Sequence, residues 1–326
     1  MILITGGAGF LGSQLALSLS ESKRASLAIC DPALDHRPEI LDGCDVVESV
    51  CPKSLTAFIQ DYGTSLEAVF HLGAISSTSE TDLSLLVDNN IRLTAELFEA
   101  CGKNDIAFFY ASSAAVYGDG SNGFIDDDRL SSIADLKPLN PYGWSKAMAD
   151  LLVATFAATN SAIPTTWAGL RFFNVFGPGE KHKGEMQSPV PKFYEQIKKS
   201  GKVQLFRSTQ NAIGDGEQSR DFVWVKDCVE VMRWLLDGPR VSGIINVGSG
   251  EANSFAELAE SVCAAMGVEP SIEWVPTPQN IAKGYQAFTQ ADTRKLRDAG
   301  CELEFTPFKK AIALYVDELK ANPPRA

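Results

Sequence analysis

The sequence is poor in the residues that build metal centres and disulfide frameworks. It has only three histidines, scattered at positions 36, 71 and 182, so a histidine-rich metal site is not expected. Its seven cysteines are an odd number without a CxxC pair, which argues against a disulfide framework. No apolar run approaches the length that crosses a bilayer.

Basic residues are also outnumbered: 29 Lys and Arg against 41 Asp and Glu give a formal net charge of −12. This balance argues against nucleic acid and anionic membrane surfaces as partners. An anionic ligand must therefore be held by local basic groups. The first expected strand starts at Met1, which leaves no room for a signal peptide. We therefore expect a cytoplasmic protein, whose 326 residues suffice for a large core and two lobes.

A dinucleotide-binding pattern opens the chain. Residues 1–4 are apolar and predict a buried strand, and Gly7, Gly9 and Gly12 then fit G-x-G-x-x-G at the start of a helix. Glycine is needed there because a Cβ atom would block the tight turn and the approach of a pyrophosphate. A second expected strand, 27–30, ends at Asp31, where an acid is expected to meet the adenosine ribose.

Strands and helices alternate along the first half of the chain. Strands are expected at 45–48, 68–72, 106–111 and 165–170, and helices near 52–62, 82–101 and 142–159. This alternation predicts an α/β protein with a Rossmann-type doubly wound parallel sheet. Later strands are expected at 221–225 and 244–247, with helices near 226–236 and 254–266. We expect residues 1–172 with 221–249 to form the dinucleotide-binding domain, and 173–220 with 250–326 a smaller α/β substrate-binding lobe.

Tyr142 and Lys146 stand four residues apart, so on a helix both side chains lie on one face. Tyrosine has a pKa of about 10 and is a poor base at neutral pH. A nearby ammonium favours the phenolate, so we expect Lys146 to lower the pKa of Tyr142. A lone pair with this spacing would say little. Here the glycine pattern precedes it, and Ser112 and Ser113 lie in the chain between that pattern and Tyr142, so the spacing points to catalysis.

Together, the glycine pattern and the Tyr-x-x-x-Lys pair resemble the extended short-chain dehydrogenase/reductase superfamily. More selective blocks are similar, in order, to the family of ADP-L-glycero-D-manno-heptose 6-epimerases. These blocks are 73–78, 110–118, 171–178, 182–184, 220–223 and 284–292. The resemblance covers nearly the whole chain.

The resemblance implies an isomerase that acts on a nucleotide-diphosphate sugar and forms a homo-oligomer. Such enzymes oxidise a sugar carbinol with a tightly held nicotinamide cofactor, one per subunit, and return the hydride to the other face of the ketone. Two faces require two acid–base groups, and the family's positions match Tyr142 and Lys183. Lys146 matches the lysine that tunes the tyrosine and grips the nicotinamide ribose. Ser113 matches the hydroxyl that bonds the reacting oxygen.

The resemblance also implies two sets of binding residues. The cofactor set comprises Gly6, Gly9, Phe10, Leu11, Gly12, Asp31, Leu72, Gly73, Ala74, Ile75, Ser76, Asn89, Tyr142, Lys146, Val175 and Lys183. The substrate set comprises Ser113, Asn174, Glu185, Lys192, Phe206, Arg220 and Tyr285. His71 is expected to be a satisfied core histidine and His182 an ordinary loop residue.

Some positions depart from the family pattern. The family's arginine after Gly-Pro is Gly179 here, its small hydroxyl residue after Lys-Gly is Glu185, and the loop 208–219 is long. Asp31 by itself favours NAD, since a carboxylate repels a 2′-phosphate. The family binds NADP despite an acid at this position, and Arg37 offers a compensating charge, so we expect NADP, with NAD as the alternative.

Rival functions share parts of this pattern. A nucleotide-sugar dehydratase carries an Asp-Glu pair after the hydroxyl residue, whereas Ala114 and Ala115 follow Ser113 here. A UDP-hexose 4-epimerase is the closer alternative, because it needs no second base from the loop that carries Lys183. Another nucleotide-sugar epimerase or reductase of the superfamily is a further alternative function. A catalytically silent dinucleotide sensor is disfavoured, because the tyrosine and lysine are both present.

Overall fold

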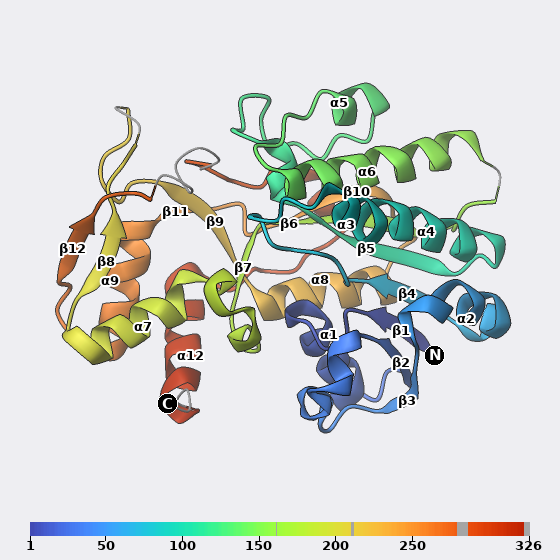
Figure 1. Cartoon of the computed structure of the whole chain (residues 1–326), viewed down its shortest axis with the longest axis horizontal. Coiled ribbons are helices and arrows are strands. Elements are labelled where there is room, and N and C mark those ends of the chain that lie inside the picture. Colours follow the sequence, from blue (N-terminus) through green and yellow to red (C-terminus); the bar gives the residue numbers. More distant parts are fainter. Residues whose placement is uncertain (161, 210–211, 279–285, 323–326) are drawn as a thin grey trace.

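A seven-stranded parallel sheet forms the centre of the molecule, with strand order β10-β6-β5-β4-β1-β2-β3. The computed structural model describes residues 1–160, 162–209, 212–278 and 286–322 (Figure 1). The sheet strands are β1 (Ile2–Thr5), β2 (Leu27–Cys30), β3 (Val46–Ser49), β4 (Ala68–His71), β5 (Ala107–Ser113), β6 (Trp167–Phe172) and β10 (Ser242–Val247). The predicted α/β Rossmann-type sheet is confirmed.

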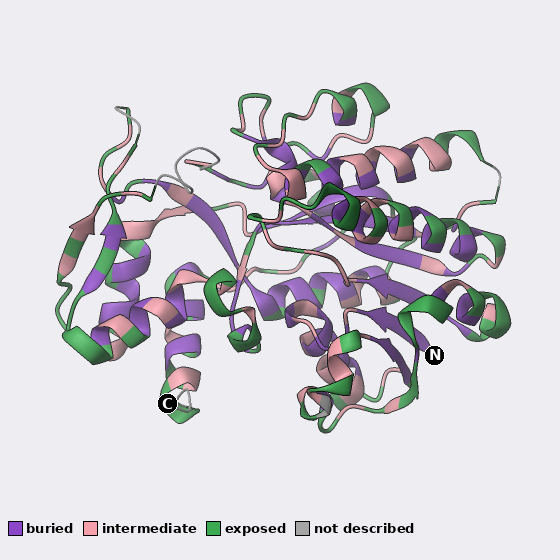
Figure 2. Cartoon of the chain, viewed as in Figure 1, coloured by how far each residue is buried: buried purple, intermediate pink, exposed green. Residues whose placement is uncertain are grey.

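Helices cover both faces of this sheet, as Figure 1 shows. On one face lie α1 (Phe10–Glu21) and α8 (Val225–Asp237); on the other lie α2 (Leu55–Tyr62), α4 (Leu93–Lys103) and α6 (Pro141–Thr159). Side chains alternate along each strand, so Ile2 and Ile4 enter one core while Leu3 enters the other. Strands β1, β2 and β4 are consequently buried on both sides, whereas the edge strand β3 is mostly exposed (Figure 2).

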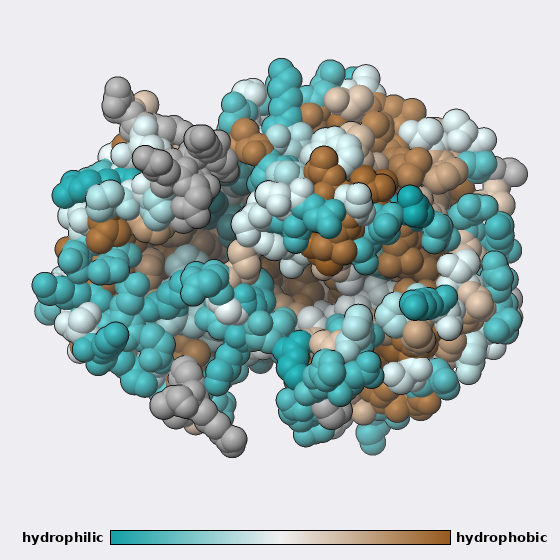
Figure 3. Space-filling model, viewed as in Figure 1, coloured by the Kyte–Doolittle hydropathy of each residue, from teal (hydrophilic) through white to brown (hydrophobic). Residues whose placement is uncertain are grey.

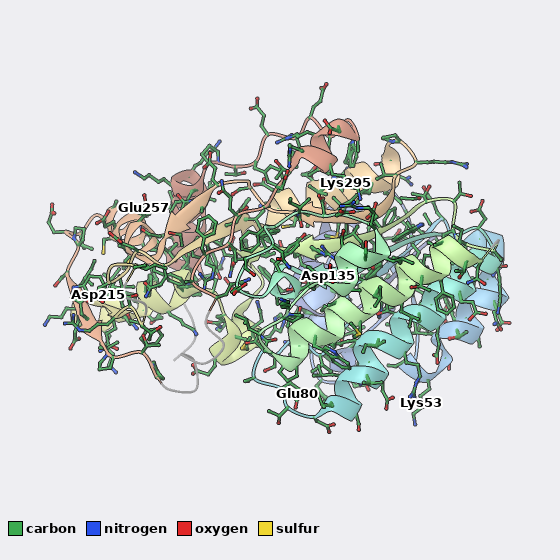
Figure 4. All side chains as sticks on the ribbon, turned by 90° about the horizontal axis from the view of Figure 1, so that it is seen from above. Lys53, Glu80, Asp135, Asp215, Glu257 and Lys295 are labelled. Atoms are coloured by element: carbon green, nitrogen blue, oxygen red, sulfur yellow. The ribbon has the colours of Figure 1, made fainter. Side chains whose placement is uncertain are left out.

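A smaller lobe is built on its own core. Its strands are β7 (Asn174–Phe176), β9 (Ser219–Trp224) and β11 (Ala252–Ser254) in one sheet, and β8 (Val203–Phe206) and β12 (Ile272–Val275) in another. Its helices are α7 (Pro189–Ser200), α9 (Phe255–Met266) and α12 (Phe308–Ala321). Seen from above, Asp215 and Glu257 lie at this end of the molecule and Lys53 at the other (Figure 4).

Strand β9 joins the two cores. Its Val223 packs in the core of the large sheet, whereas Phe222 and Trp224 on its opposite face pack in the core of the smaller lobe. β9 pairs with β7 and β11, while β10 is the strand that returns to the large sheet. The boundaries between the two predicted domains stay a prediction.

Short elements complete the described chain. They are α3 (Leu83–Leu86), α5 (Leu130–Ala134), α11 (Arg294–Asp298), the π-helical η5 (Val87–Arg92) and the 3-10 turns η1 (Pro32–Asp35), η2 (Pro38–Leu41), η3 (Pro52–Ser54), η4 (Gly63–Ser65), η6 (Ala114–Tyr117) and η7 (Lys181–Met186). The helix predicted over 82–101 is thus interrupted by a π-helical turn. None of the helices in the described part of the chain has the length and apolar character needed to span a bilayer.

Candidate active site

A cavity of about 530 Å³ lies at the carboxyl ends of the large sheet's strands. In parallel α/β sheets this edge is where ligands bind. Figure 3 shows the surface hollowed between the two halves of the molecule, with hydrophobic residues visible inside. The cavity walls come from both halves, because η7 of the smaller lobe lines it together with β1, β4, β5 and α6.

The glycine loop, residues 6–12 at the junction of β1 and α1, forms one wall of this cavity and fits a dinucleotide. Gly6 has a φ of +68°, and a Cβ atom on it would lie 2.5 Å from the backbone nitrogen of Gly73. A Cβ atom on Gly12 would lie 2.1 Å from the carbonyl oxygen of Gly6, so neither position accepts a side chain. Helix α1 starts after Gly9 without a side-chain cap. Its first N–H groups therefore face the cavity as a site for a phosphate.

Asp31 and Arg37 lie at the adenosine end expected of this cavity. The two carboxylate oxygens of Asp31 accept backbone hydrogen bonds from Ala8, at 2.9 Å, and from Ala33, at 2.8 Å. Arg37 lines the same cavity, and within the described residues its guanidinium makes no ion pair or hydrogen bond. The carboxylate is therefore held in place by the backbone, while the arginine charge is available to a ligand anion.

Helix α6 presents Tyr142 and Lys146 to the cavity. The Asn140 side chain caps the helix by accepting the Gly143 N–H at 2.8 Å, and Pro141 occupies its first position. The ammonium of Lys146 donates to the carbonyl oxygen of Ala111 at 2.7 Å, so it is anchored on strand β5.

The pKa shifts of this pair correct the expectation from the sequence. Burial raises the pKa of Tyr142, although a hydrogen bond with Ser113 acts in the opposite direction. Burial also lowers the pKa of Lys146 to about 8. The predicted lowering of the tyrosine pKa is therefore wrong for this structure, because burial and the charge of Asp150 raise this pKa and only the hydrogen bond with Ser113 lowers it.

Lys183 reaches the cavity from the smaller lobe, on the turn η7. Its Nζ atom lies 5.0 Å from the centroid of the Phe10 ring, at the start of α1. Burial lowers the pKa of Lys183, and the charge of Lys192 adds to this effect, whereas Glu180 raises it. A lysine with a lowered pKa is suited to acid–base chemistry nearer neutral pH.

Glu180 anchors the turn that carries Lys183. It is fully buried, and its carboxylate accepts hydrogen bonds from the Ser188 backbone and hydroxyl, both at 2.6 Å, and from the Gly177 N–H at 3.4 Å. The two ends of η7 are thus joined through one carboxylate. The turn between them is more open, since Lys181, Glu185 and their neighbours are exposed.

Every predicted catalytic and cofactor-binding residue lines this one cavity, although the role of each stays a prediction. The lining set includes Gly6, Gly9, Phe10, Leu11, Gly12, Asp31, Leu72, Gly73, Ala74, Ile75, Ser76, Asn89, Ser113, Tyr142, Lys146, Val175 and Lys183. Many of them follow the carboxyl ends of β1, β2, β4 and β5, while η5, α6 and η7 bring Asn89, Tyr142, Lys146 and Lys183 to the same edge of the sheet.

Most predicted substrate residues lie outside the cavity lining, on the side of the smaller lobe. Asn174 and Glu185 are exposed, Phe206 on β8 is 38% exposed, and Tyr285 lies outside the described residues. Lys192 donates to the carbonyl oxygen of Glu185 at 2.6 Å. Arg220 is buried in β9, where it donates to the Ser219 carbonyl at 2.9 Å and stacks 5.7 Å from the Phe255 ring. Their contact with substrate stays a prediction.

Three residues have a larger part in the site than the sequence indicated. His182 is more than a loop residue, since it lines the cavity and its pKa is lowered by burial and by the charge of Arg37. His71 is only half satisfied: Nδ1 bonds Thr5 Oγ1 at 2.7 Å, while Nε2 is buried without a partner among the described residues. Burial lowers the pKa of His71 to about 3, so the ring is neutral.

The third residue is Asn90, whose neighbour Asn89 was singled out instead. Its amide accepts the Ile75 N–H and donates to the Ile75 carbonyl, both at 2.9 Å, and also donates to the Ser145 hydroxyl. Asn90 therefore fixes the loop after β4 against α6. It lies in the π-helical turn η5, a feature that often marks functional sites but leaves no recognisable sequence pattern.

The fold and this cavity belong to a known class of nucleotide-dependent enzymes. Residues 2–248 match the model of the NAD dependent epimerase/dehydratase family, and the chain belongs to that family. A protein of Nitratidesulfovibrio vulgaris (strain DP4) named ADP-L-glycero-D-manno-heptose-6-epimerase is 41% identical over 98% of both chains. The resemblance seen in the sequence motifs is thereby confirmed, as is a nicotinamide dinucleotide as the class of cofactor.

Solved structures support the same assignment. The ADP-L-glycero-D-manno-heptose-6-epimerase of Helicobacter pylori is 26% identical, with a TM-score of 0.76 over 98% of this chain and 96% of that chain. The UDP-glucose 4-epimerase of Thermus thermophilus, in complex with NAD, is also 26% identical, with a TM-score of 0.75 over 98% of both chains. Both cover nearly the whole molecule, including the smaller lobe.

Proposed function

We propose that this protein is an isomerase that interconverts the two C6″ epimers of ADP-glycero-manno-heptose. The observation that carries the proposal is one cavity lined by the glycine loop and by two acid–base candidates from different lobes, Tyr142 and Lys183. The relatives of that name, 36–41% identical over nearly their whole length, support the choice of sugar.

The residues of this chain divide the work of epimerisation between them. The bound nicotinamide supplies reversible hydride acceptance, so the reaction has no net redox change. Tyr142 takes the proton of the C6″ hydroxyl as the carbinol is oxidised, and Ser113 donates a hydrogen bond to the same oxygen. Once the ketone had turned over, Lys183 would give a proton to its oxygen on the opposite face of the sugar. The reverse direction exchanges the two roles.

We propose that the cofactor is NADP, because Arg37 lines the same cavity as Asp31 and makes no ion pair or hydrogen bond within the described residues. Arginine suits a 2′-phosphate, since its planar fork makes paired hydrogen bonds with phosphate oxygens. Replacing Arg37 by Gln should weaken NADP binding about 10–100-fold and leave NAD binding nearly unchanged. Calorimetric Kd values for both dinucleotides decide the question, and equal losses for both would reject this role of Arg37.

The sugar is tested by incubating the purified protein with ADP-D-glycero-D-manno-heptose and, separately, with UDP-galactose, while NMR follows each sugar. We expect conversion of the heptose at C6″ and none of the hexose. Conversion of UDP-galactose alone would replace this proposal by a 4-epimerase. If neither sugar reacts while the dinucleotide stays bound, the substitutions at Gly179 and Glu185 have moved the specificity to another nucleotide sugar.

A further inference from the structure

Helix α6 carries a third polar residue on the face that holds the tyrosine and lysine. Asp150 follows Lys146 by four residues and Tyr142 by eight, which places the three side chains along one stripe of the helix. Burial increases along this stripe: Tyr142 is half-buried, Lys146 is 3% exposed and Asp150 is fully buried. The carboxylate therefore lies beneath the candidate catalytic pair, away from the cavity opening.

Three side chains donate hydrogen bonds to the carboxylate of Asp150. The hydroxyl of Tyr110 lies 3.1 Å from Oδ1, and the hydroxyl of Ser112 and the Nε atom of Arg171 lie 3.0 and 2.9 Å from Oδ2. Tyr110 and Ser112 belong to β5, and Arg171 belongs to β6. One carboxylate thus ties the helix to two adjacent strands of the central sheet.

These hydrogen-bonded polar side chains form a buried layer, which continues into a third strand. In the sheet register Ser112 pairs with Arg171 and Arg171 with Asn246 of β10, so their side chains lie on one face. Arg171 Nη1 donates to the Tyr117 hydroxyl at 3.0 Å, and that hydroxyl donates to Asn246 Oδ1 at 2.6 Å. The layer lies directly beside the β5 positions that the site uses, Ala111 and Ser113.

Stability alone is a poor explanation for this buried ion pair. Asp150 is fully buried and Arg171 is 1% exposed, and in the described residues Arg171 Nη2 has no hydrogen-bond acceptor. Desolvation of two charges often cancels their attraction, so an apolar pair of similar volume is often no less stable. The ion pair supplies two things that an apolar pair lacks. Its hydrogen bonds fix the orientation of α6 on the strands, and its carboxylate places a negative charge near Lys146.

That charge acts on both members of the candidate catalytic pair. Asp150 raises the pKa of Lys146, against the lowering by burial, and it also raises the pKa of Tyr142. The other titratable groups nearby are Tyr110, Tyr117 and Arg171 around the carboxylate, and His71 beside Lys146. Burial raises the pKa of both tyrosines and keeps them protonated, and His71 is neutral. The charges of Asp128 and Asp126 act on Tyr110 and Tyr117, so among the described residues Asp150 is the carboxylate whose charge acts on Lys146 and Tyr142.

We propose that Asp150 is a positioning residue, which with Arg171 fixes the place and the charge balance of Lys146 and Tyr142. It holds α6 on β5 at the point where the Ala111 carbonyl accepts the Lys146 ammonium and Ser113 meets Tyr142. Asp150 itself does not line the cavity. Its effect on catalysis is therefore transmitted through Lys146 and Tyr142.

The first test replaces Asp150 by Asn, which keeps the size of the side chain and removes its charge. Without that charge the pKa values of Lys146 and Tyr142 both fall, and the buried charge of Arg171 acts in the same direction. We expect kcat for the heptose to fall about 10–100-fold with KM nearly unchanged. The whole pH profile of kcat should move to lower pH. A merely structural role would lower activity without moving the profile.

A second variant keeps the test decisive if the Asn protein is unstable. Asp150→Leu combined with Arg171→Met replaces the ion pair by apolar side chains, which should restore folding while leaving the profile displaced to lower pH. Asp227→Asn is the matched control, because Asp227 is also a buried carboxylate bonded by Thr306 but lies on α8, outside the cavity lining. Its pH profile should equal that of the parent protein.

The activity readout rests on the proposed function, so a spectroscopic one accompanies it. Ultraviolet titration of tyrosinate, taken as the difference between each protein and its Tyr142→Phe version, reports the pKa of Tyr142 without substrate. A lower pKa in the Asp150 variants supports the proposal even if the sugar is misassigned. An unchanged titration and pH profile in a folded variant would overturn it. Failure of both variants to fold would assign the pair to stability alone and overturn it too.

Discussion

The two sides of the candidate active site are constructed very differently. On one side, Tyr142 and Lys146 belong to a 19-residue helix that is capped, buried and bonded to the central sheet. On the other side, Lys183 belongs to a six-residue turn in which Gly184 has a φ of +52°. The first group is positioned by regular structure, and the second by a loop joined at its base through Glu180.

This difference indicates how one site can serve two faces of a ketone. A group that must meet the cofactor and the substrate in one fixed geometry gains from a rigid support. A group that approaches a sugar in two orientations tolerates a looser support, because the sugar moves between the two half-reactions. We therefore expect substitutions on the tyrosine side to cost more than substitutions on the lysine side.

The largest effect is expected for Tyr142→Phe, which removes only a hydroxyl. The fold and the bound dinucleotide should survive, while turnover of the heptose falls by about 10²–10⁴, the usual scale for losing a general acid–base group. Steady-state rates and cofactor absorbance measure the two quantities. Tyr62→Phe on the surface of α2 is the matched control and should be silent. Near-normal turnover in Tyr142→Phe would remove the tyrosine from the mechanism.

A smaller effect is expected for Lys183→Met, which keeps the aliphatic length and loses the ammonium. Epimerisation should fall by about 10²-fold, because only one of two proton transfers loses its group. The first half-reaction is seen as reduced nicotinamide after a single addition of substrate. Its rate should fall less for one C6″ epimer than for the other. The exposed Lys181, in the same turn, supplies the control Lys181→Met. Equal losses in both directions would contradict two separate acid–base groups.

The sequence predicted the tyrosine side in more detail than the lysine side. Glycine spacing, apolar periodicity and the Tyr-x-x-x-Lys pair are local patterns, so the large sheet and its cavity lining follow from them. Prolines and charge, by contrast, obscured α7, which the structure forms over Pro189–Ser200. Prolines near its start fit the first turn of a helix, where a missing N–H has no intrahelical partner.

The partners of buried polar groups could not be predicted from local patterns. Asp150 and Arg171 are 21 residues apart, Asn90 and Ile75 are 15 apart, and Thr5 and His71 are 66 apart. Each contact joins a strand, helix or loop to a distant segment that it meets only in the folded protein. The direction of the tyrosine pKa was wrong for the same reason, because the burial that controls it is a property of the whole fold.

The smallest effect is expected for Glu180→Gln, which tests how the lysine side is held. The amide still accepts one hydrogen bond, so the turn should persist, while the free energy of unfolding falls by about 1–3 kcal/mol. Glu180 raises the pKa of Lys183, so its loss should move the limb of the kcat profile that reports this ammonium to lower pH. Turnover at neutral pH should fall only a few-fold, about 3–10-fold. The exposed Glu195→Gln on α7 serves as control. Because the displaced limb belongs to Lys183, it should disappear when Glu180→Gln is combined with Lys183→Met. A limb that persists in that double variant would show that another group titrates, and the lysine side would then need a different acid.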